Sequence, residues 1–197
     1  CRLYDPTEGV ILLNGVDIRK YNYDEYLSIF SVVFQDFRLF SFSLGQNVAA
    51  GAEYDRERAV SCLREAGFGE RLDRMPEGLE TSLYQDFDKA GMEISGGEAQ
   101  KIALARALYK NAPFIVLDEP TAALDPVSEY EVYRKFNEIS GGRTAVYISH
   151  RLASCRFCDE ILVFHEGQIV QHGAHEALLA ESGGKYAELW NAQAQYY

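Results

Sequence analysis

The sequence predicts an α/β fold with a mainly parallel sheet and an antiparallel β flank. Helical patterns alternate with short apolar runs such as 114–117, which is the order that parallel strands with crossover helices require. Two hairpin patterns, around Asn14-Gly15 and Glu166-Gly167, add the antiparallel strands. The 197 residues, 47% hydrophobic and 25% charged, suit one ordinary globular domain.

The expected strands are short apolar runs bounded by turn residues. They are residues 10–13, 16–18, 29–34, 114–117, 144–148, 160–164 and 168–171. Asn14-Gly15 predicts a type I′ turn between the first two, because both residues tolerate a positive φ. The runs 114–117 and 144–148 are of the buried type, in which a strand is covered on both faces.

The expected helices carry apolar residues at helical spacing. They are residues 55–66, 95–110, 129–139, 175–180 and 185–193. Asp55 is a favourable N-cap for the first of them, and Gly67 is a favourable stop. The helix over 95–110 is the clearest, because its apolar residues face one side and alanine is frequent.

The net charge of −11 comes from 19 basic and 30 acidic residues. An acidic surface repels phosphate backbones, so nucleic acid is not expected as a partner. A small phosphate ligand remains compatible, because backbone N–H groups can bind an anion locally. No apolar run approaches the ~20 residues that span a bilayer, which predicts a soluble domain.

Cys155 and Cys158 form a C-x-x-C pattern, which raises the question of a metal or redox site. A zinc site needs four ligands, and neither a second C-x-x-C nor an H-x₃-H follows. We therefore expect two small, partly buried side chains in a reducing compartment.

An apolar strand is expected to end at two adjacent carboxylates, Asp118 and Glu119, followed by Pro120. Ligands of open α/β sheets bind at the carboxyl ends of strands. Asp118 can hold a hydrated Mg²⁺ that bridges phosphate oxygens, and Glu119 can orient and polarise a water. An acidic loop after a buried strand is the alternative interpretation.

Ser95 and Glu98 have the spacing of a capping box at the start of the helix over 95–110. A capping box does not explain Gly96 and Gly97, because each glycine in a first turn costs about 1 kcal/mol relative to alanine. Glycines suit a helix N-terminus that a ligand approaches closely, which is a geometry for binding phosphate.

Gln35 and His150 each follow an expected strand. His150 is therefore expected beside Asp118 and Glu119, where it can donate to a γ-phosphate and to an attacking water. Gln35 can ligate Mg²⁺ or that water through its amide. The alternatives are a histidine satisfied by backbone contacts and a glutamine without a role.

The order and spacing of these patterns resemble the motif series of ATP-binding cassette (ABC) proteins, over about residues 5–189. The series here is Gln35, Ile94-Ser95-Gly96-Gly97-Glu98, Leu117-Asp118-Glu119-Pro120, Ala123-Leu124-Asp125 and Ser149-His150-Arg151. The resemblance implies a P-loop NTPase-like fold, a single ABC ATPase domain over 1–197, and a helical subdomain within about 43–110. Ser149-His150-Arg151-Leu152 followed by Asp159-Glu160-Ile161 resembles the exporter branch.

The resemblance implies that the strand-end residues act on ATP and Mg²⁺. Asp118 corresponds to the Walker B aspartate, Glu119 to the catalytic glutamate, and His150 to the switch histidine. Gln35 corresponds to the Q-loop glutamine, which contacts Mg²⁺ and water and senses the membrane domain.

The resemblance also implies contacts across a dimer. Ser95, Gly96 and Gly97 correspond to the signature motif, which contacts the γ-phosphate of ATP held by the opposite subunit. Asp125 corresponds to the D-loop aspartate at the dimer seam. Glu98 stands where glutamine is commoner, and a mild effect of its charge on ATP affinity is expected.

The function implied is that of the ATP-binding and ATP-hydrolysing motor domain of an ABC exporter. Its partners would be ATP, a transmembrane domain and a second nucleotide-binding domain, identical or different, on the cytoplasmic side of the membrane. The loop over 37–44 either contacts the membrane domain or packs locally. Two other functions stay open: an ABC-type ATPase of chromosome maintenance or repair, and a non-enzymatic interaction module.

One family motif is absent, because no G-x-x-x-x-G-K-[ST] occurs in the sequence. That loop supplies the backbone cradle and the lysine that bind the phosphates. Residues 1–4 resemble the end of the helix that follows the loop. We therefore expect an N-terminally truncated fragment that does not hydrolyse ATP at a meaningful rate by itself.

Overall fold

The computed structural model describes residues 1–120 and 141–194. It divides into two compact units, residues 1–147 and 148–197, and each is described by itself. The helix expected over 129–139 lies outside the described residues. None of the described helices combines the length and the apolar character needed to cross a membrane.

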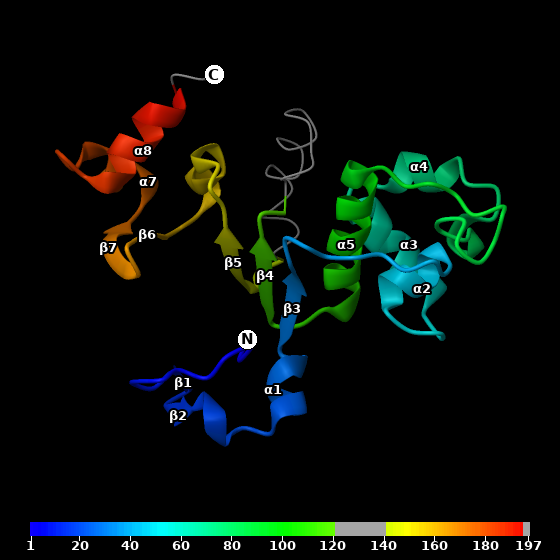
Figure 1. Cartoon of the computed structure of the whole chain (residues 1–197), viewed down its shortest axis with the longest axis horizontal. Coiled ribbons are helices and arrows are strands. Elements are labelled where there is room, and N and C mark those ends of the chain that lie inside the picture. The colour runs from blue at the N-terminus through cyan, green and yellow to red at the C-terminus, as the bar shows by residue number, and fades with distance from the viewer. Residues whose placement is uncertain (121–140, 195–197) are drawn as a thin grey trace. The chain divides into compact units, whose positions relative to one another are not determined.

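A three-stranded sheet lies at the centre of the first unit (Figure 1). Its order is β3 (Phe30–Val33), β4 (Phe114–Asp118) and β5 (Thr144–Ile148). β3 and β4 are parallel, with Val33 opposite Leu117. Because parallel neighbours arise from crossover connections, this pair confirms the α/β prediction.

β5 departs from the expectation of burial on both faces. Ala145 and Tyr147 pack against the core, whereas Val146 and Ile148 are exposed. Successive side chains of a strand point to opposite faces, and the described elements cover only one face of β5. A continuous apolar run therefore did not indicate two-sided burial here.

The longest described helix of the first unit, α5, packs against two of its other helices. The helices described in this unit are α1 (Tyr23–Ser28), α2 (Leu44–Ala49), α3 (Arg56–Glu65), α4 (Gly69–Asp73) and α5 (Gly96–Lys110), with short 3₁₀ helices at η1 (Ile18–Lys20) and η2 (Gly78–Glu80). α5 contacts β3 as well as α2 and α3, and lies between them in Figure 1. The helix expected over 55–66 is confirmed as α3, with Asp55 accepting a hydrogen bond from the Arg58 N–H as N-cap.

The first hairpin is formed by β1 (Leu12–Leu13) and β2 (Val16–Asp17). Asn14 and Gly15 between them have φ angles of +52° and +77°. Two consecutive positive φ angles are what a type I′ turn requires, so this prediction is confirmed.

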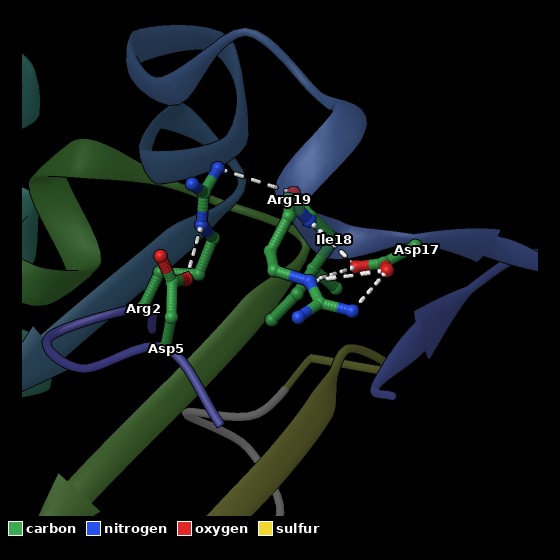
Figure 2. Close-up of polar contacts among 5 residues, drawn as sticks. All are labelled: Arg2, Asp5, Asp17, Ile18 and Arg19. Carbon is green, nitrogen blue, oxygen red and sulfur yellow. Dashed lines mark hydrogen bonds and ion pairs between the residues drawn. The ribbon is translucent and has the colours of Figure 1, made fainter. Parts of the chain in front are cut away.

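Arg2 ties the first residues of the chain to η1 and α1 (Figure 2). Its Nη1 atom donates to the Ile18 carbonyl at 3.1 Å, and its Nε atom donates to Asp5 at 3.4 Å. The guanidinium also lies 5.3 Å from the ring centroid of Tyr23 and 5.8 Å from that of Tyr26. Charge and cation–π contacts therefore fix this segment without a strand or helix of its own.

Asp17 and Arg19 stabilise the start of η1 (Figure 2). The Asp17 carboxylate accepts from the Arg19 backbone N–H at 3.0 Å and from its guanidinium at 2.6 Å. The side-chain hydrogen bond and then the backbone one lower the pKa of Asp17 from 3.8 to about 2.

The second unit contains a hairpin, a 3₁₀ helix and two α-helices. They are η3 (Leu152–Phe157), β6 (Ile161–His165), β7 (Gln168–Gly173), α7 (His175–Ala180) and α8 (Lys185–Ala194). Leu178 and Tyr186 are central to its small core, and the Tyr186 hydroxyl lies 2.8 Å from His175 Nδ1. The hairpin and both helices agree with the sequence predictions.

Cys155 and Cys158 are half-buried free thiols, which confirms the expected partial burial. Burial raises the pKa of Cys158 to about 11. Its thiol therefore stays protonated near neutral pH, and a protonated thiol is a poor nucleophile.

The pKa of Asp17 provides a test of the η1 cap. Replacing Arg19 with glutamine removes the guanidinium hydrogen bonds, so the midpoint of the Asp17 titration should rise from about 2 towards 3.8. Because the folded-state pKa is lowered, the stabilisation by this pair is present above pH 3.8 and is lost as the pH falls towards 2. Side-chain carboxyl NMR measures the midpoint.

Lys20→Gln is the matched control, because it removes a neighbouring charge but no hydrogen bond to Asp17. It should shift the midpoint much less than Arg19→Gln does. Equal shifts in the two variants would contradict the assignment to the Arg19 hydrogen bonds.

Candidate functional site

The register of β3 and β4 places Gln35 beside Glu119. Val33 pairs with Leu117, and each site residue lies two positions further along its strand. The Gln35 Nε2 atom donates to Glu119 Oε2 at 2.8 Å. Two side chains 84 positions apart in the sequence therefore meet at the carboxyl ends of paired strands.

Glu119 has an unusual backbone conformation, with a φ angle of +47°. Few residues other than glycine adopt this left-handed region, and those that do are held there by their surroundings. The buried Gln100 of α5 donates from Nε2 to the Glu119 carbonyl at 3.2 Å. Gln35 therefore holds the side chain of Glu119, and Gln100 of α5 holds its backbone.

Asp118, Glu119 and Gln35 together present the oxygen donors that Mg²⁺ prefers. Asp118 is the last residue of β4 and is half-buried. In the parts of the chain that the structure describes, no group of three His, Cys, Asp or Glu side chains can hold a metal ion.

Ser95 begins α5 as its N-cap, and the predicted capping box is present. Its Oγ atom accepts from the Glu98 N–H at 3.3 Å, and Glu98 Oε2 accepts from the Ser95 N–H at 2.9 Å. Gly96 is exposed and Gly97 is half-buried in the first turn. The turn thus offers an accessible, positively polarised helix end.

Arg71 of α4 is a site residue that the sequence did not reveal. Its Nε atom lies 2.9 Å from Glu98 Oε1. The two residues are separated by 27 positions and belong to different helices, so neither periodicity nor a motif links them. The ion pair compensates the carboxylate that stands beside Ser95.

Arg106 fixes the segment that follows Gln35. From α5 it donates to the Asn47 carbonyl at 2.7 Å and to the Arg38 carbonyl at 3.2 Å. Burial lowers the pKa of Arg106. This long-range contact joins α5, α2 and the loop after β3, and neither a motif nor a periodic pattern indicates it.

The loop over 37–44 presents aromatic side chains in two directions. Phe37 and Leu39 pack against the core, whereas Phe40 and Phe42 are 57% and 55% exposed. Asn47, which is 2% exposed, donates to the Phe40 carbonyl and accepts from the Phe40 N–H, both at 2.8 Å. The two exposed rings are therefore held outward by a fixed backbone.

Two predicted site residues are not placed against the others. His150 follows β5 in the second unit, where its carbonyl accepts a hydrogen bond from Gln193. Its position beside Asp118 and Glu119 stays a prediction. Asp125 lies outside the described residues.

The residues that form this site lie in a segment that matches a known protein family. Residues 1–122, more than half of the chain, match a family model described as ABC transporter. The chain belongs to the ABC transporter family. Since the match includes Gln35, Ser95, Asp118 and Glu119, the family motifs and the clustered side chains lie in the same segment.

Relatives and solved structures agree with the family. The ATP-dependent lipid A-core flippase of Burkholderia orbicola (strain AU 1054) is 41% identical over 194 residues, which are 98% of this chain and 32% of that protein. The flippase of the same name from Haemophilus ducreyi (strain 35000HP / ATCC 700724) is 39% identical with the same coverage.

A solved structure of a bacterial Atm1-family ABC exporter with ATP bound superposes with a TM-score of 0.88 at 34% identity, covering 98% of this chain and 33% of that one. This likeness confirms the P-loop NTPase-like fold. The chain spans about a third of the length of these ABC proteins.

Arg106 provides a stability test of the contact between α5 and the Gln35 loop. Arg106→Met keeps the aliphatic packing but leaves the Asn47 and Arg38 carbonyls without their donor. We expect the free energy of unfolding to fall by about 2 kcal/mol, the typical range for hydrogen bonds from a charged group. Urea denaturation measures the change.

Lys89→Met is the control, since Lys89 lies on an exposed loop. It should change the free energy of unfolding by less than about 0.5 kcal/mol. A similar loss in both variants would contradict a specific role of Arg106.

Proposed function

We propose that this chain is part of the ATP-driven motor domain of an ABC exporter. The observation that carries the proposal is the Gln35–Glu119 hydrogen bond at the ends of paired parallel strands, with Asp118 as the last residue of β4. Relatives with 39–41% identity named as ATP-dependent flippases support it. So does the likeness to an exporter with ATP bound.

In this proposal Glu119 acts on the water that attacks the γ-phosphate. Its carboxylate polarises the water, and Gln35 holds that carboxylate in place through the 2.8 Å hydrogen bond. Asp118 and Gln35 would hold Mg²⁺, which when bound neutralises charge on the phosphate oxygens. His150 would donate to the γ-phosphate from the end of β5.

The first turn of α5 serves a second nucleotide-binding domain. Ser95, Gly96 and Gly97 would contact the γ-phosphate of ATP held by that domain, and Asp125 would lie at the seam. The accessible N-terminus of a 15-residue helix supports this assignment, because its N–H groups attract an anion. The second domain is either a copy of this one or a related chain.

The exposed rings of Phe40 and Phe42 would contact the transmembrane domain on the cytoplasmic side of the membrane. They project from a loop whose backbone is tied to α5 and which begins two residues after Gln35. Large exposed aromatic side chains on a rigid loop are typical of interaction sites.

We also propose that these 197 residues alone do not turn over ATP. The sequence contains no G-x-x-x-x-G-K-[ST]. Without the backbone cradle and its lysine, the carboxylates lack a positioned phosphate, and positioning dominates phosphoryl transfer.

Glu119→Gln tests the proposed catalytic role. In the full-length protein, we expect the substitution to lower the Mg²⁺-dependent ATPase rate at least ~100-fold, because general base catalysis is lost. ATP binding should persist, since the amide keeps the shape of the side chain. Phosphate release and nucleotide binding are measured on the same preparation.

Glu160→Gln, an exposed glutamate of the second unit, is the control and should leave the rate unchanged. An unaltered rate in Glu119→Gln would overturn the catalytic assignment. Turnover by the 197-residue chain, lost in its own Glu119→Gln variant, would overturn the proposed inactivity of the chain alone.

The double substitution Phe40→Ser and Phe42→Ser tests the membrane-domain contact. Both side chains are exposed, so the fold should tolerate the change. We expect the ATPase of full-length protein in liposomes to lose its stimulation by transported substrate, while basal ATP affinity is kept. Phe87→Ser, on another exposed loop, is the control, and equal losses of stimulation would count against the contact.

A further inference from the structure

The carboxylate of Glu98 makes different contacts through its two oxygens. Oε2 accepts from the Ser95 N–H and from the Ser95 hydroxyl, both at 2.9 Å. Oε1 forms the ion pair with Arg71 at 2.9 Å. Since a hydroxyl has one proton, the Ser95 proton is directed at Glu98 in this structure.

Besides the ion pair with Glu98, the guanidinium of Arg71 makes one other polar contact within the described residues. Its Nε atom is buried and makes no aligned hydrogen bond within the described ranges, so its contact with Glu98 is an ion pair alone. Its Nη2 atom meets the sulfur of Met92 at 3.2 Å.

The other charged residues of α4 are engaged elsewhere. Glu70 pairs with Arg74, and Asp73 pairs with Arg64 at 2.9 Å. Glu98 is therefore the carboxylate that pairs with Arg71 in the described ion pairs.

Glu98 creates a problem for the proposed phosphate contact. A carboxylate three residues after Ser95, with a quarter of its side chain exposed, repels a polyphosphate that approaches the start of α5. It also accepts the hydrogen bond that the Ser95 hydroxyl would otherwise donate to the phosphate. A cation on the far side of the carboxylate reduces the repulsion of the phosphate.

We propose that Arg71 is a positioning residue of the phosphate-binding half-site, and this rests on the proposed function. Arg71 compensates the charge of Glu98 at the start of α5, so that a γ-phosphate meets less repulsion there. The need for Arg71 arises from the carboxylate at position 98. With a neutral glutamine there, Arg71 becomes dispensable for ATP.

A double-mutant cycle in the full-length protein tests the proposal. Arg71→Met should raise the KM for ATP about tenfold with little change in kcat, because one compensating charge is lost beside the phosphate. Glu98→Gln should leave KM equal to or below the unsubstituted value. The double variant should match Glu98→Gln, and Arg71→Lys should recover much of the loss.

Arg74→Met is the matched control on the same helix, since Arg74 pairs with Glu70 and not with Glu98. It should leave KM unchanged. Raising the ionic strength should narrow the KM difference between Arg71→Met and the unsubstituted protein, because salt screens the carboxylate. A purely structural role of Arg71 would show no such dependence on salt.

Three outcomes overturn the role of Arg71. They are an unchanged KM in Arg71→Met, a KM increase that persists in the Glu98→Gln background, and a loss of folding in Arg71→Met that Glu98→Gln does not relieve. If the unsubstituted protein is active and any of these results is found, the proposed motor function stands and only the role of Arg71 is rejected. Absence of ATP binding and turnover in the unsubstituted full-length protein removes both.

Discussion

The parallel register between β3 and β4 is the constraint on which the candidate site depends. Val33 and Leu117 are opposite each other and almost fully buried, so the core fixes how the strands align. A slip by one residue would turn every side chain of one strand to the other face. The Gln35–Glu119 hydrogen bond forms because this register brings the carboxyl ends of the two strands side by side. The register itself is set by the burial of apolar side chains.

α5 connects this strand register to more distant parts of the first unit, because its 15 residues span about 22 Å. Ser95 lies at its start, Gln100 reaches the Glu119 carbonyl, and Arg106 holds the loop after Gln35. A single rigid helix thus links the proposed contact with a second domain, the strand-end carboxylate and the exposed Phe40 loop. Any movement of α5 must change these contacts together, which is a physical basis for the proposed coupling between ATP and a transmembrane domain.

Local chemistry explains which features could be predicted from the sequence. The N-caps at Asp55 and Ser95 and the Asn14-Gly15 turn depend on neighbouring residues, so short patterns sufficed. Five or six residues give only a weak periodic signal, so the sequence predicts α7 but not α1, α2 and α4. The Arg71–Glu98 and Arg106–Asn47 contacts join residues that only the folded chain brings together.

The chain is acidic, yet it is compatible with the proposed phosphate ligand, because the charges that act on the phosphate are those close to it. A net charge of −11 is spread over a surface that salt screens within about 10 Å, so it has little effect on a phosphate at a given helix end. What a bound phosphate would sense is the first turn of α5, where N–H groups attract it and Glu98 repels it. Arg71 shifts this balance towards attraction of the phosphate, because its Nε atom lies 2.9 Å from Glu98, the acidic residue of that turn. The net charge is therefore screened before it reaches the phosphate, and the affinity for an anion at this site depends on the charges within the first turn of α5 and on Arg71.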